Sequence, residues 1–260
     1  SALVCVGQDN NGHLAAANLR EHQVKTELLQ SSANADTSFS FIIINRRSRE
    51  RIIFSYRGAT QELKLRQADL RALNASQYVY LSSLSGDHWL DNLKVVFSTH
   101  RPLIAWNPGE VQLRYGADKL RPFLKYCYLF CLNRDEAVEF LKSSSKYKRS
   151  PRSFMSDIRN LLTAIKSFGP QIVLITAGTD GAYAYDGSNY YHQKIIKGQK
   201  RLDATGVGDA FNSTVLFGLI RYQDLAKAMK LAVYNTAKLV AHIGAQKGLI
   251  TAKDLKKIKL

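Results

Sequence analysis

Residues 126–142 read YCYLFCLNRDEAVEFLK, a short apolar run that passes directly into an amphipathic pattern. The first seven residues are typical of a strand that is buried on both faces of a parallel sheet, and residues 135–142 have the spacing of a helix. The same alternation covers most of the chain, with strand-like runs at 79–81, 103–106 and 172–176 and a helical pattern over 153–168. It predicts an α/β fold with a doubly wound, mainly parallel sheet.

Length and composition indicate one α/β domain with a real core, since the chain has 260 residues of which 45% are hydrophobic. Charged or polar residues interrupt every apolar run, so we expect no membrane span and a cytoplasmic protein. The three cysteines also suit a reducing compartment. Cys127 and Cys131 fall in the predicted buried strand, where we expect them to pack in the core and not to bind metal.

The chain is strongly basic, with a formal net charge of +16. Such a charge suits either nucleic acid or an anionic small molecule as partner. The charge is spread through the sequence, with its densest runs at 142–152 and 253–259, and no nucleic-acid-reading motif is present. We therefore expect a solvated basic surface biased toward an anionic substrate, and no nucleic-acid partner.

Residues 36–56 depart from the alternation. Two β-rich runs, TSFSFIIIN and IIFSY, flank the charged stretch RRSRER, which is typical of an antiparallel hairpin. Such a hairpin either covers a pocket or is a plain edge hairpin. We divide the chain into an α/β core of residues 1–35 and 58–260 and a small β lid of residues 36–57.

The segment DATGVGDAF, residues 203–211, contains the most informative polar pattern of the chain. Gly206 and Gly208 open a predicted helix, and Asp209 lies in its first turn. The free N–H groups and the dipole of a helix start form an anion site, suited to a transferring phosphoryl group. A neighbouring carboxylate could accept the proton of an attacking hydroxyl. The alternative is that Asp209 only caps a helix beside a glycine turn.

A further helix, predicted over 226–241, is apolar on most faces and should be buried.

DATGVGDAF resembles D-T-x-G-A-G-D, the C-terminal signature of the ribokinase-like (PfkB) carbohydrate kinases. Ala204 and Val207 depart from the usual residues, but Val207 keeps its backbone N–H. The resemblance implies a ribokinase-like fold and transfer of the ATP γ-phosphoryl group to an alcohol. It also implies that Asp209 is the catalytic base in contact with the substrate. The implied anion hole is formed by Gly206, Val207 and Gly208.

Other segments resemble the same family in the same order. Residues 6–12, VGQDNNG, resemble its V-G-x-D-x-x-G segment, and the hairpin resembles its substrate-covering lid. Asn133 and Glu136 resemble its N-x-x-E motif, which implies contact with Mg²⁺ through water. Read alone, these two residues form a helix start with Asn133 as the cap.

The implied nucleotide site involves four further residues. Thr176, Gly178 and Gly181 resemble the T-x-G-x-x-G turn that touches the nucleotide, although two glycines so spaced also suit a plain turn between strands. Asn235 matches a position that lines the adenine pocket, although an Asn on an apolar helix also suits a structural hydrogen bond.

The implied cofactors are ATP and Mg²⁺, with K⁺ as a candidate near Asp203, Thr205 and the segment 244–245. Ribose-like or fructose-like sugars are the first choice of substrate, and an adenosine-like nucleoside is the alternative. Arg57, on the lid side, could pair with an acidic sugar or remain solvated. A homodimer through the lid is the candidate assembly.

Members of this family carry a further stretch before the V-G-x-D segment, with a first strand, an Asp near the substrate and a G-G-x-x-x-N motif. The sequence begins at the later segment, so we expect a chain that lacks the N-terminal part of the usual core. The alternative to an active kinase is therefore a catalytically weak nucleotide-binding relative.

Overall fold

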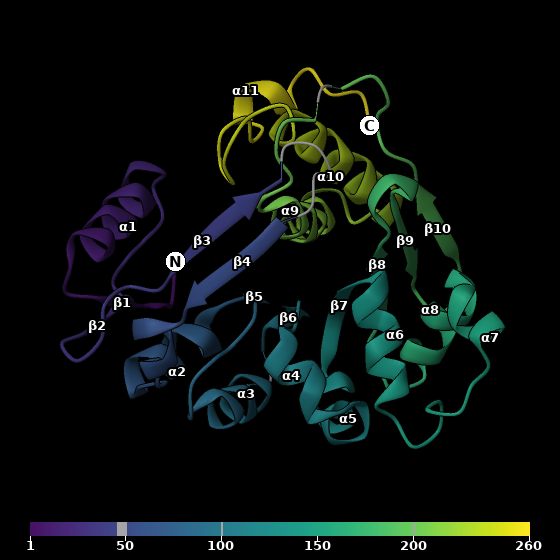
Figure 1. Cartoon of the computed structure of the whole chain (residues 1–260), viewed down its shortest axis with the longest axis horizontal. Coiled ribbons are helices and arrows are strands. Elements are labelled where there is room, and N and C mark those ends of the chain that lie inside the picture. Colours follow the sequence, from purple (N-terminus) through teal and green to yellow (C-terminus); the bar gives the residue numbers. More distant parts are fainter. Residues whose placement is uncertain (46–50, 100, 200) are drawn as a thin grey trace. The chain divides into compact units, whose positions relative to one another are not determined.

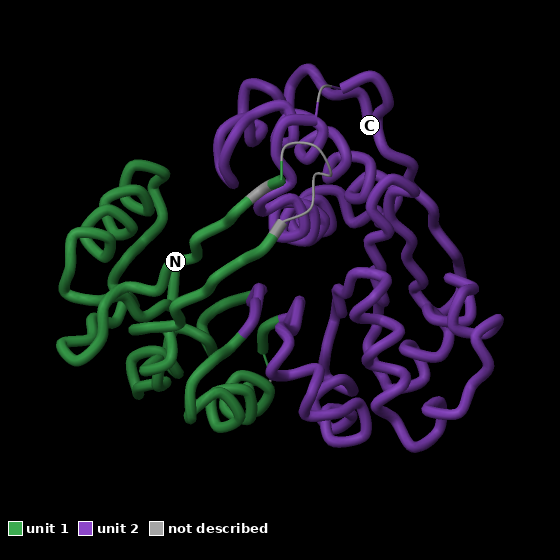
Figure 2. The backbone as a smooth tube through the Cα atoms, viewed as in Figure 1, with its two compact units in different colours: residues 1–77, 84–102 green, residues 78–83, 103–260 purple. Residues whose placement is uncertain are grey.

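The computed structural model describes residues 1–45, 51–99, 101–199 and 201–260, and the chain divides into two compact units. Unit 1 comprises residues 1–77 and 84–102, and unit 2 comprises residues 78–83 and 103–260, as Figure 2 shows. The division into an α/β core and a lid of residues 36–57 stays a prediction. No helix among the described residues is long and apolar enough to cross a membrane.

Unit 2 is built on a six-stranded sheet with the strand order β10-β9-β8-β7-β6-β5 (Figure 1). Strands β5 to β8 run parallel, and β9 and β10 are antiparallel to their neighbours. The strands are β5 (Tyr78–Leu81), β6 (Leu103–Trp106), β7 (Cys127–Asn133), β8 (Ile172–Thr176), β9 (Ala182–Tyr185) and β10 (Tyr190–Gln193). The prediction of an α/β fold with a mainly parallel sheet is confirmed.

Alternate side chains of the central strands are buried on the two faces of this sheet. Leu129, Cys131 and Leu174 belong to one core cluster with residues of α9 (Val207–Tyr222) and α10 (Leu225–Leu239). From the other face, the ring of Phe130 contacts that of Phe140 on α6 (Arg134–Lys142), with 5.6 Å between centroids. Helices therefore cover both faces, as the doubly wound prediction requires. Cys127 and Cys131 are fully buried, which confirms their placement in the core.

One predicted element of unit 2 was wrong in detail, because residues 153–168 do not form one helix. The chain forms α7 (Arg152–Ser156) and, after a break at Asp157, α8 (Ile158–Lys166). The Asp157 carboxylate accepts hydrogen bonds from the N–H groups of Arg159 and Asn160 and so caps a new helix. The remaining helices of this unit are α4 (Glu110–Tyr115), α5 (Ala117–Leu124), the 3₁₀ turn η2 (Gly178–Asp180) and α11 (Ala252–Leu255).

Unit 1 pairs two short parallel strands, β1 (Cys5–Gly7) and β2 (Gln30–Ser32). Its helical elements are α1 (Asn10–Glu21), the 3₁₀ helix η1 (Gly58–Glu62), α2 (Gln67–Ala75) and α3 (Trp89–Phe97). Asp9 in the V-G-x-D-x-x-G segment caps α1 by accepting a 2.7 Å hydrogen bond from Gly12 N–H. It also accepts 2.7 Å bonds from the N–H and the hydroxyl of Thr37, just before the hairpin. Asp9 therefore joins the start of α1 to the base of the hairpin.

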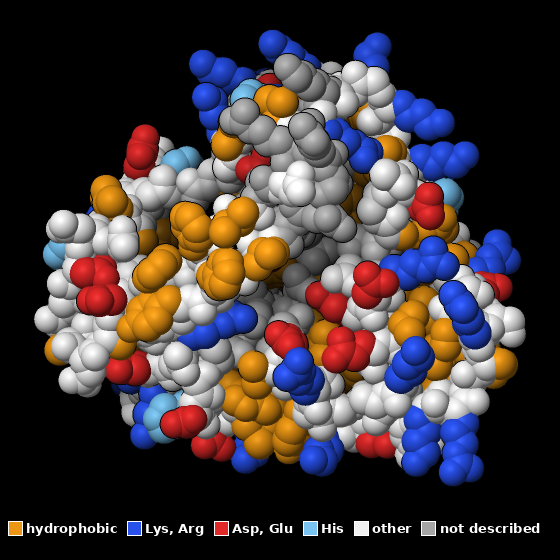
Figure 3. All heavy atoms as spheres, in the orientation of Figure 1, with side chains coloured by type: hydrophobic (Ala, Val, Ile, Leu, Met, Phe, Trp, Pro, Cys, Tyr) orange, Lys and Arg blue, Asp and Glu red, His pale blue; other side chains and the backbone are white. Residues whose placement is uncertain are grey.

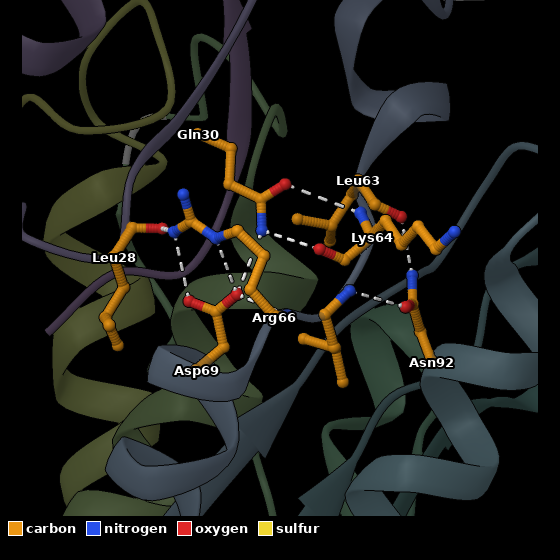
Figure 4. A network of polar contacts seen from close by, with 8 residues as sticks. Leu28, Gln30, Leu63, Lys64, Arg66, Asp69 and Asn92 are labelled. Carbon is orange, nitrogen blue, oxygen red and sulfur yellow. Dashed lines mark hydrogen bonds and ion pairs between the residues drawn. The ribbon is translucent and has the colours of Figure 1, made fainter.

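A polar network around Asp69 fixes the loop before α2 (Figure 4). The buried Asp69 carboxylate lies 3.0 Å from the guanidinium of Arg66 and accepts a bond from Gln30 of β2. Burial disfavours the charge, but the bonds from Arg66 outweigh it and hold the pKa of Asp69 below its usual value. Asn92 of α3 bonds the backbone of Leu63 and Leu65 in the same loop.

The predicted hairpin is present as a separate two-stranded antiparallel sheet, β3 (Phe39–Ile44) with β4 (Arg51–Tyr56). Phe39 pairs with Tyr56 and Phe41 with Phe54. Residues 46–50 of the predicted charged tip lie outside the described residues. The antiparallel pairing is thus confirmed, and the role of the hairpin as a lid stays a prediction.

Candidate active site

The start of α9 is shaped by Gly206. Gly206 is the N-cap of the helix and has a left-handed backbone with φ of 72°. A Cβ atom at this position would lie 2.7 Å from the Cβ of Ala245. Both the backbone angle and the close approach therefore require glycine at this turn.

The first turn of α9 presents unused backbone donors. Within the described residues, the N–H groups of Gly206 and Gly208 donate no hydrogen bond, and that of Val207 makes only a 3.4 Å contact with the carbonyl of Ala204. Gly208 lies inside the helix, and a Cβ there would meet no atom within 4 Å. Nothing in the described chain requires glycine at 208, and the open space leaves room for an anion at the helix start.

Asp209 lies in the same turn, with an exposed side chain. In the part of the chain that the structure describes, its carboxylate accepts no hydrogen bond and forms no ion pair, and the cap of α9 is Gly206. These contacts therefore do not support the alternative that Asp209 caps the helix. Partial desolvation raises the pKa of Asp209, although the residue as a whole is exposed.

Asp203 organises the loop that leads into this turn. Its carboxylate accepts hydrogen bonds of 2.9 Å and 2.7 Å from the N–H and the hydroxyl of Thr205. It also accepts a 2.9 Å bond from the N–H of Gly244. The bond from Gly244 and those from Thr205 lower the pKa of Asp203. The structure thus brings together Asp203, Thr205 and Gly244, the residues named for a monovalent cation.

Asn133 and Glu136 form a reciprocal cap at the start of α6. The Asn133 side chain accepts a 2.8 Å bond from Glu136 N–H, and the Glu136 carboxylate accepts a 2.8 Å bond from Asn133 N–H. Asn133 and Glu136 thus form the helix start that these two residues, read alone, predict. Burial raises the pKa of Glu136, and the negative charges of Glu139, Asp135 and Asp209 add to that rise. Among the described residues, no group of three or more His, Cys, Asp or Glu side chains could hold a metal ion.

The predicted nucleotide turn connects the last parallel strand, β8, to β9. Gly178 and Gly181 have positive φ angles, of 55° and 91°, and the N–H of Ala177 bonds the carbonyl of Gly181. A Cβ at Gly181 would meet the Gln193 carbonyl at 2.1 Å, whereas one at Gly178 would meet nothing within 4 Å. Thr176 is the register partner of Asn133. The turn and the start of α6 therefore lie side by side at the carboxyl ends of two parallel strands, where open α/β sheets bind ligands.

Asn235 is buried on α10 and is hydrogen-bonded at both ends of its amide. It donates a 2.7 Å bond to the hydroxyl of Thr214 on α9 and accepts a 2.9 Å bond from the N–H of Ile250. Asn235 therefore has the structural hydrogen bonds that its alternative interpretation expected. Its contact with a nucleotide stays a prediction.

Arg57 belongs to unit 1, where its side chain is exposed before η1, so its contact with substrate also stays a prediction.

Three residues of unit 2 were missed by the sequence reasoning. Tyr80 of β5, Asn107 directly after β6 and Asn212 of α9 come together in its interior, where Asn212 donates a 3.1 Å bond to Asn107. The position of two of them could have been a signal: Asn212 follows Asp209 by three residues, and Asn107 comes directly after a parallel strand.

Comparison with known proteins identifies the family of this chain. Residues 1–252 match the family model described as pfkB family carbohydrate kinase, so the chain belongs to that family. Its members are phosphotransferases that act on a sugar hydroxyl, and the predicted recognition and enzyme class are confirmed.

Individual relatives are distant but cover most of the chain. The chain is 24% identical to an uncharacterized sugar kinase of Archaeoglobus fulgidus, over 96% of this chain and 94% of that one. It is 26% identical to mouse ribokinase, over 98% of this chain and 77% of that one. It is 19% identical to a nucleoside kinase of Methanocaldococcus jannaschii, over 96% and 76% of the two chains.

Solved structures show the same fold. The ribokinase of Thermotoga maritima has a TM-score of 0.81 at 18% identity, covering 98% of this chain and 79% of that one. A candidate ribokinase II of Escherichia coli, in complex with ATP and Mg²⁺, also has a TM-score of 0.81 at 18% identity, covering 98% and 81%. The ribokinase-like fold is therefore confirmed.

Proposed function

We propose that this chain transfers the γ-phosphoryl group of ATP to a hydroxyl of a small sugar, with Asp209 as the catalytic base. One observation carries the proposal: a carboxylate without a hydrogen-bond partner among the described residues lies in the same helical turn as unused backbone donors. A carboxylate that only stabilised the helix would be expected to accept backbone hydrogen bonds, as Asp157 and Asp9 do.

The reaction needs few groups, since phosphoryl transfer depends on positioning and charge stabilisation. Asp209 takes the proton of the substrate hydroxyl as its oxygen bonds to the γ-phosphorus. The bond between that phosphorus and the bridging oxygen breaks, and ADP leaves with the electron pair. The N–H groups of Gly206, Val207 and Gly208 stabilise the charge on the moving phosphoryl oxygens.

Magnesium fits the chemistry at the start of α6. One oxygen of the Glu136 carboxylate accepts the Asn133 N–H, and the other has no hydrogen bond within the described residues. A free carboxylate oxygen suits a water of the magnesium shell. When bound, Mg²⁺ would neutralise the phosphate charge of the nucleotide. Asn133 would hold Glu136 in place for this contact.

The remaining residues are assigned roles around this centre. The open side of Gly178 would accept the nucleotide, with Thr176 and Gly181 shaping the turn. Asn235 would support the adenine pocket through its bonds to Thr214 and Ile250. Asp203 and Thr205, together with Gly244, would shape a K⁺ site. Arg57 would contact an acidic sugar.

The hairpin is proposed as a lid through which two copies of the chain pair. Phe39, Phe41 and Ile43 share one face of the hairpin with their partners Tyr56, Phe54 and Ile52. These six side chains are 44–62% exposed, and Figure 3 shows apolar side chains gathered over this hairpin. A contiguous apolar face of this kind usually marks an interaction surface.

An acceptor screen tests the function. ADP release would be measured with pentoses, hexoses, acidic sugars and nucleosides, in parallel for the wild type and Asp209→Asn. We expect release that depends on a ribose-like or fructose-like sugar and is lost in the variant. Release only with nucleosides would support the second candidate, which the archaeal nucleoside kinase among the relatives favours. Absence of acceptor-dependent release with every compound would overturn the proposal.

A further inference from the structure

Three polar side chains meet in the interior of unit 2, beneath the turn that carries Asp209. Asn212, only 3% exposed, donates a 3.1 Å hydrogen bond from its Nδ2 to the Oδ1 of Asn107. Asn107 in turn donates a 3.1 Å bond from its Nδ2 to the carbonyl oxygen of Cys131 on β7. A directional chain of bonds therefore runs from α9 to β7, an inner strand of the sheet.

Two buried polar atoms beside this chain of hydrogen bonds have no hydrogen-bond partner among the described residues. They are the Oδ1 of Asn212 and the hydroxyl of Tyr80. The backbone N–H of Asn107 donates a 2.9 Å bond to the carbonyl of Leu81, the residue after Tyr80, so this chain of bonds adjoins the end of β5. Burial raises the pKa of Tyr80, Cys131 and Asp209 add to the rise, and the Asn212 amide opposes it. Buried polar atoms are almost always satisfied, and a contact too long for a direct bond is commonly bridged by water.

We propose that Tyr80, Asn107 and Asn212 position Asp209 for catalysis, and that one ordered water joins the Tyr80 hydroxyl to Asn212 Oδ1. The water would accept the Tyr80 proton and donate to the amide oxygen, which satisfies both atoms. The positioning role rests on the proposed function of Asp209, whereas the bonded network does not.

The geometry of the helix explains why this network matters. Asn212 lies three residues beyond Asp209, so the two side chains are neighbours on one side of α9. The apolar core contacts of α9 are non-directional, so they define the rotation of the helix less sharply than directional hydrogen bonds do. The bonds from Asn212 through Asn107 to β7, together with the proposed water to Tyr80 of β5, help to fix the rotation of the first turns and with it the direction of the Asp209 carboxylate. The bond between Asn235 and Thr214 holds α9 one turn further along. The three residues touch no substrate and act only through this positioning.

The test compares Tyr80→Phe with Tyr78→Phe. Both substitutions remove one hydroxyl from the same side of β5, and both rings pack against the same core cluster. Amide hydrogen exchange in the first turn of α9 and steady-state kinetics would be measured for each. For Tyr80→Phe we expect faster exchange in that turn and a kcat lowered about 10- to 100-fold, the scale of a small misplacement of a catalytic group. The KM for ATP should change less than about twofold, as the interaction acts on the reacting geometry. Tyr78→Phe should behave like the wild type.

A double-mutant cycle separates positioning from general stability. If Tyr80 and Asn107 act through one network, the effects on kcat of Tyr80→Phe and Asn107→Ala should be strongly non-additive. Wild-type exchange and kcat in Tyr80→Phe would overturn the inference, as would a lower Tm with unchanged kcat and unchanged exchange in α9. If the wild type turned over no acceptor, the proposed function would fail, yet the exchange comparison would still decide whether the network anchors α9.

Discussion

The carboxylate of Asp203 accepts a 2.9 Å hydrogen bond from the backbone N–H of Gly244, 41 residues further along the chain. In the same pair of loops, Gly206 lies against Ala245, so closely that no Cβ fits between them. The loop that precedes α9 is therefore held by the loop that follows α10. The shape of the proposed anion hole depends on both segments.

Substituting Asp203 should reveal this link in the pH dependence of stability. Because the folded pKa of Asp203 is lowered, its ionised form stabilises the fold above the unfolded pKa, and this contribution disappears as pH falls through the lowered folded value. Asp203→Asn should thus reduce the free energy of unfolding at pH 7 by roughly 1–3 kcal/mol, as expected for a lost charged hydrogen-bond acceptor. Urea unfolding at pH 7 and near pH 3 checks this, and an equal deficit at both pH values would contradict it.

Asp209→Asn should abolish most turnover while leaving the fold intact. The amide keeps the size of the carboxylate but cannot accept the substrate proton, so kcat should fall by about 10²–10⁴. The Tm and the affinity for ATP should change little, because no described hydrogen bond depends on the carboxylate. Turnover, Tm and ATP binding would be measured on the same preparation. A folded, ATP-binding variant that keeps more than roughly a tenth of the wild-type kcat would refute the assignment of Asp209 as base.

Gly208→Ala should raise stability and lower activity together. Alanine is favoured over glycine inside a helix by about 0.5–1 kcal/mol, and the Cβ would meet no described atom. If the phosphoryl group approaches this turn, however, the same methyl group obstructs it, and kcat/KM should fall. Gly206→Ala is the matched control, since it should lose both stability and activity through its left-handed backbone and its contact with Ala245. Wild-type activity in Gly208→Ala would argue against the anion hole.

Charge on the apolar face of the hairpin should dissociate the proposed dimer. Phe41 and Phe54 are paired across the strands at 62% and 56% exposure, and burying an added carboxylate against a second copy is costly. Sedimentation should show a dimer for the wild type and a monomer for Phe41→Asp. Ser55→Asp, on the opposite face of the same hairpin, should remain dimeric. A wild type that is monomeric at micromolar concentration would exclude pairing through this face.

The sequence by itself determined the local elements and the signature around Asp209. The runs at Leu103–Trp106 and Ile172–Thr176 are strands with the predicted bounds, because burial on both faces leaves a continuous apolar pattern in the chain. The hairpin and the cap formed by Asn133 and Glu136 were likewise legible, since both rest on residues that are close in sequence. The break at Asp157 was not legible, because the apolar spacing continues across it while a side chain–backbone bond restarts the helix.

Only the tertiary structure decided which distant polar groups meet. The bond from Gly244 to Asp203, the bonds that occupy Asn235, and the chain from Asn212 through Asn107 to Cys131 all join separate elements. Periodicity reports how much of each residue is buried but not what lies opposite it. Hydrogen bonds act over about 3 Å, so their partners are settled only when the helices pack on the sheet.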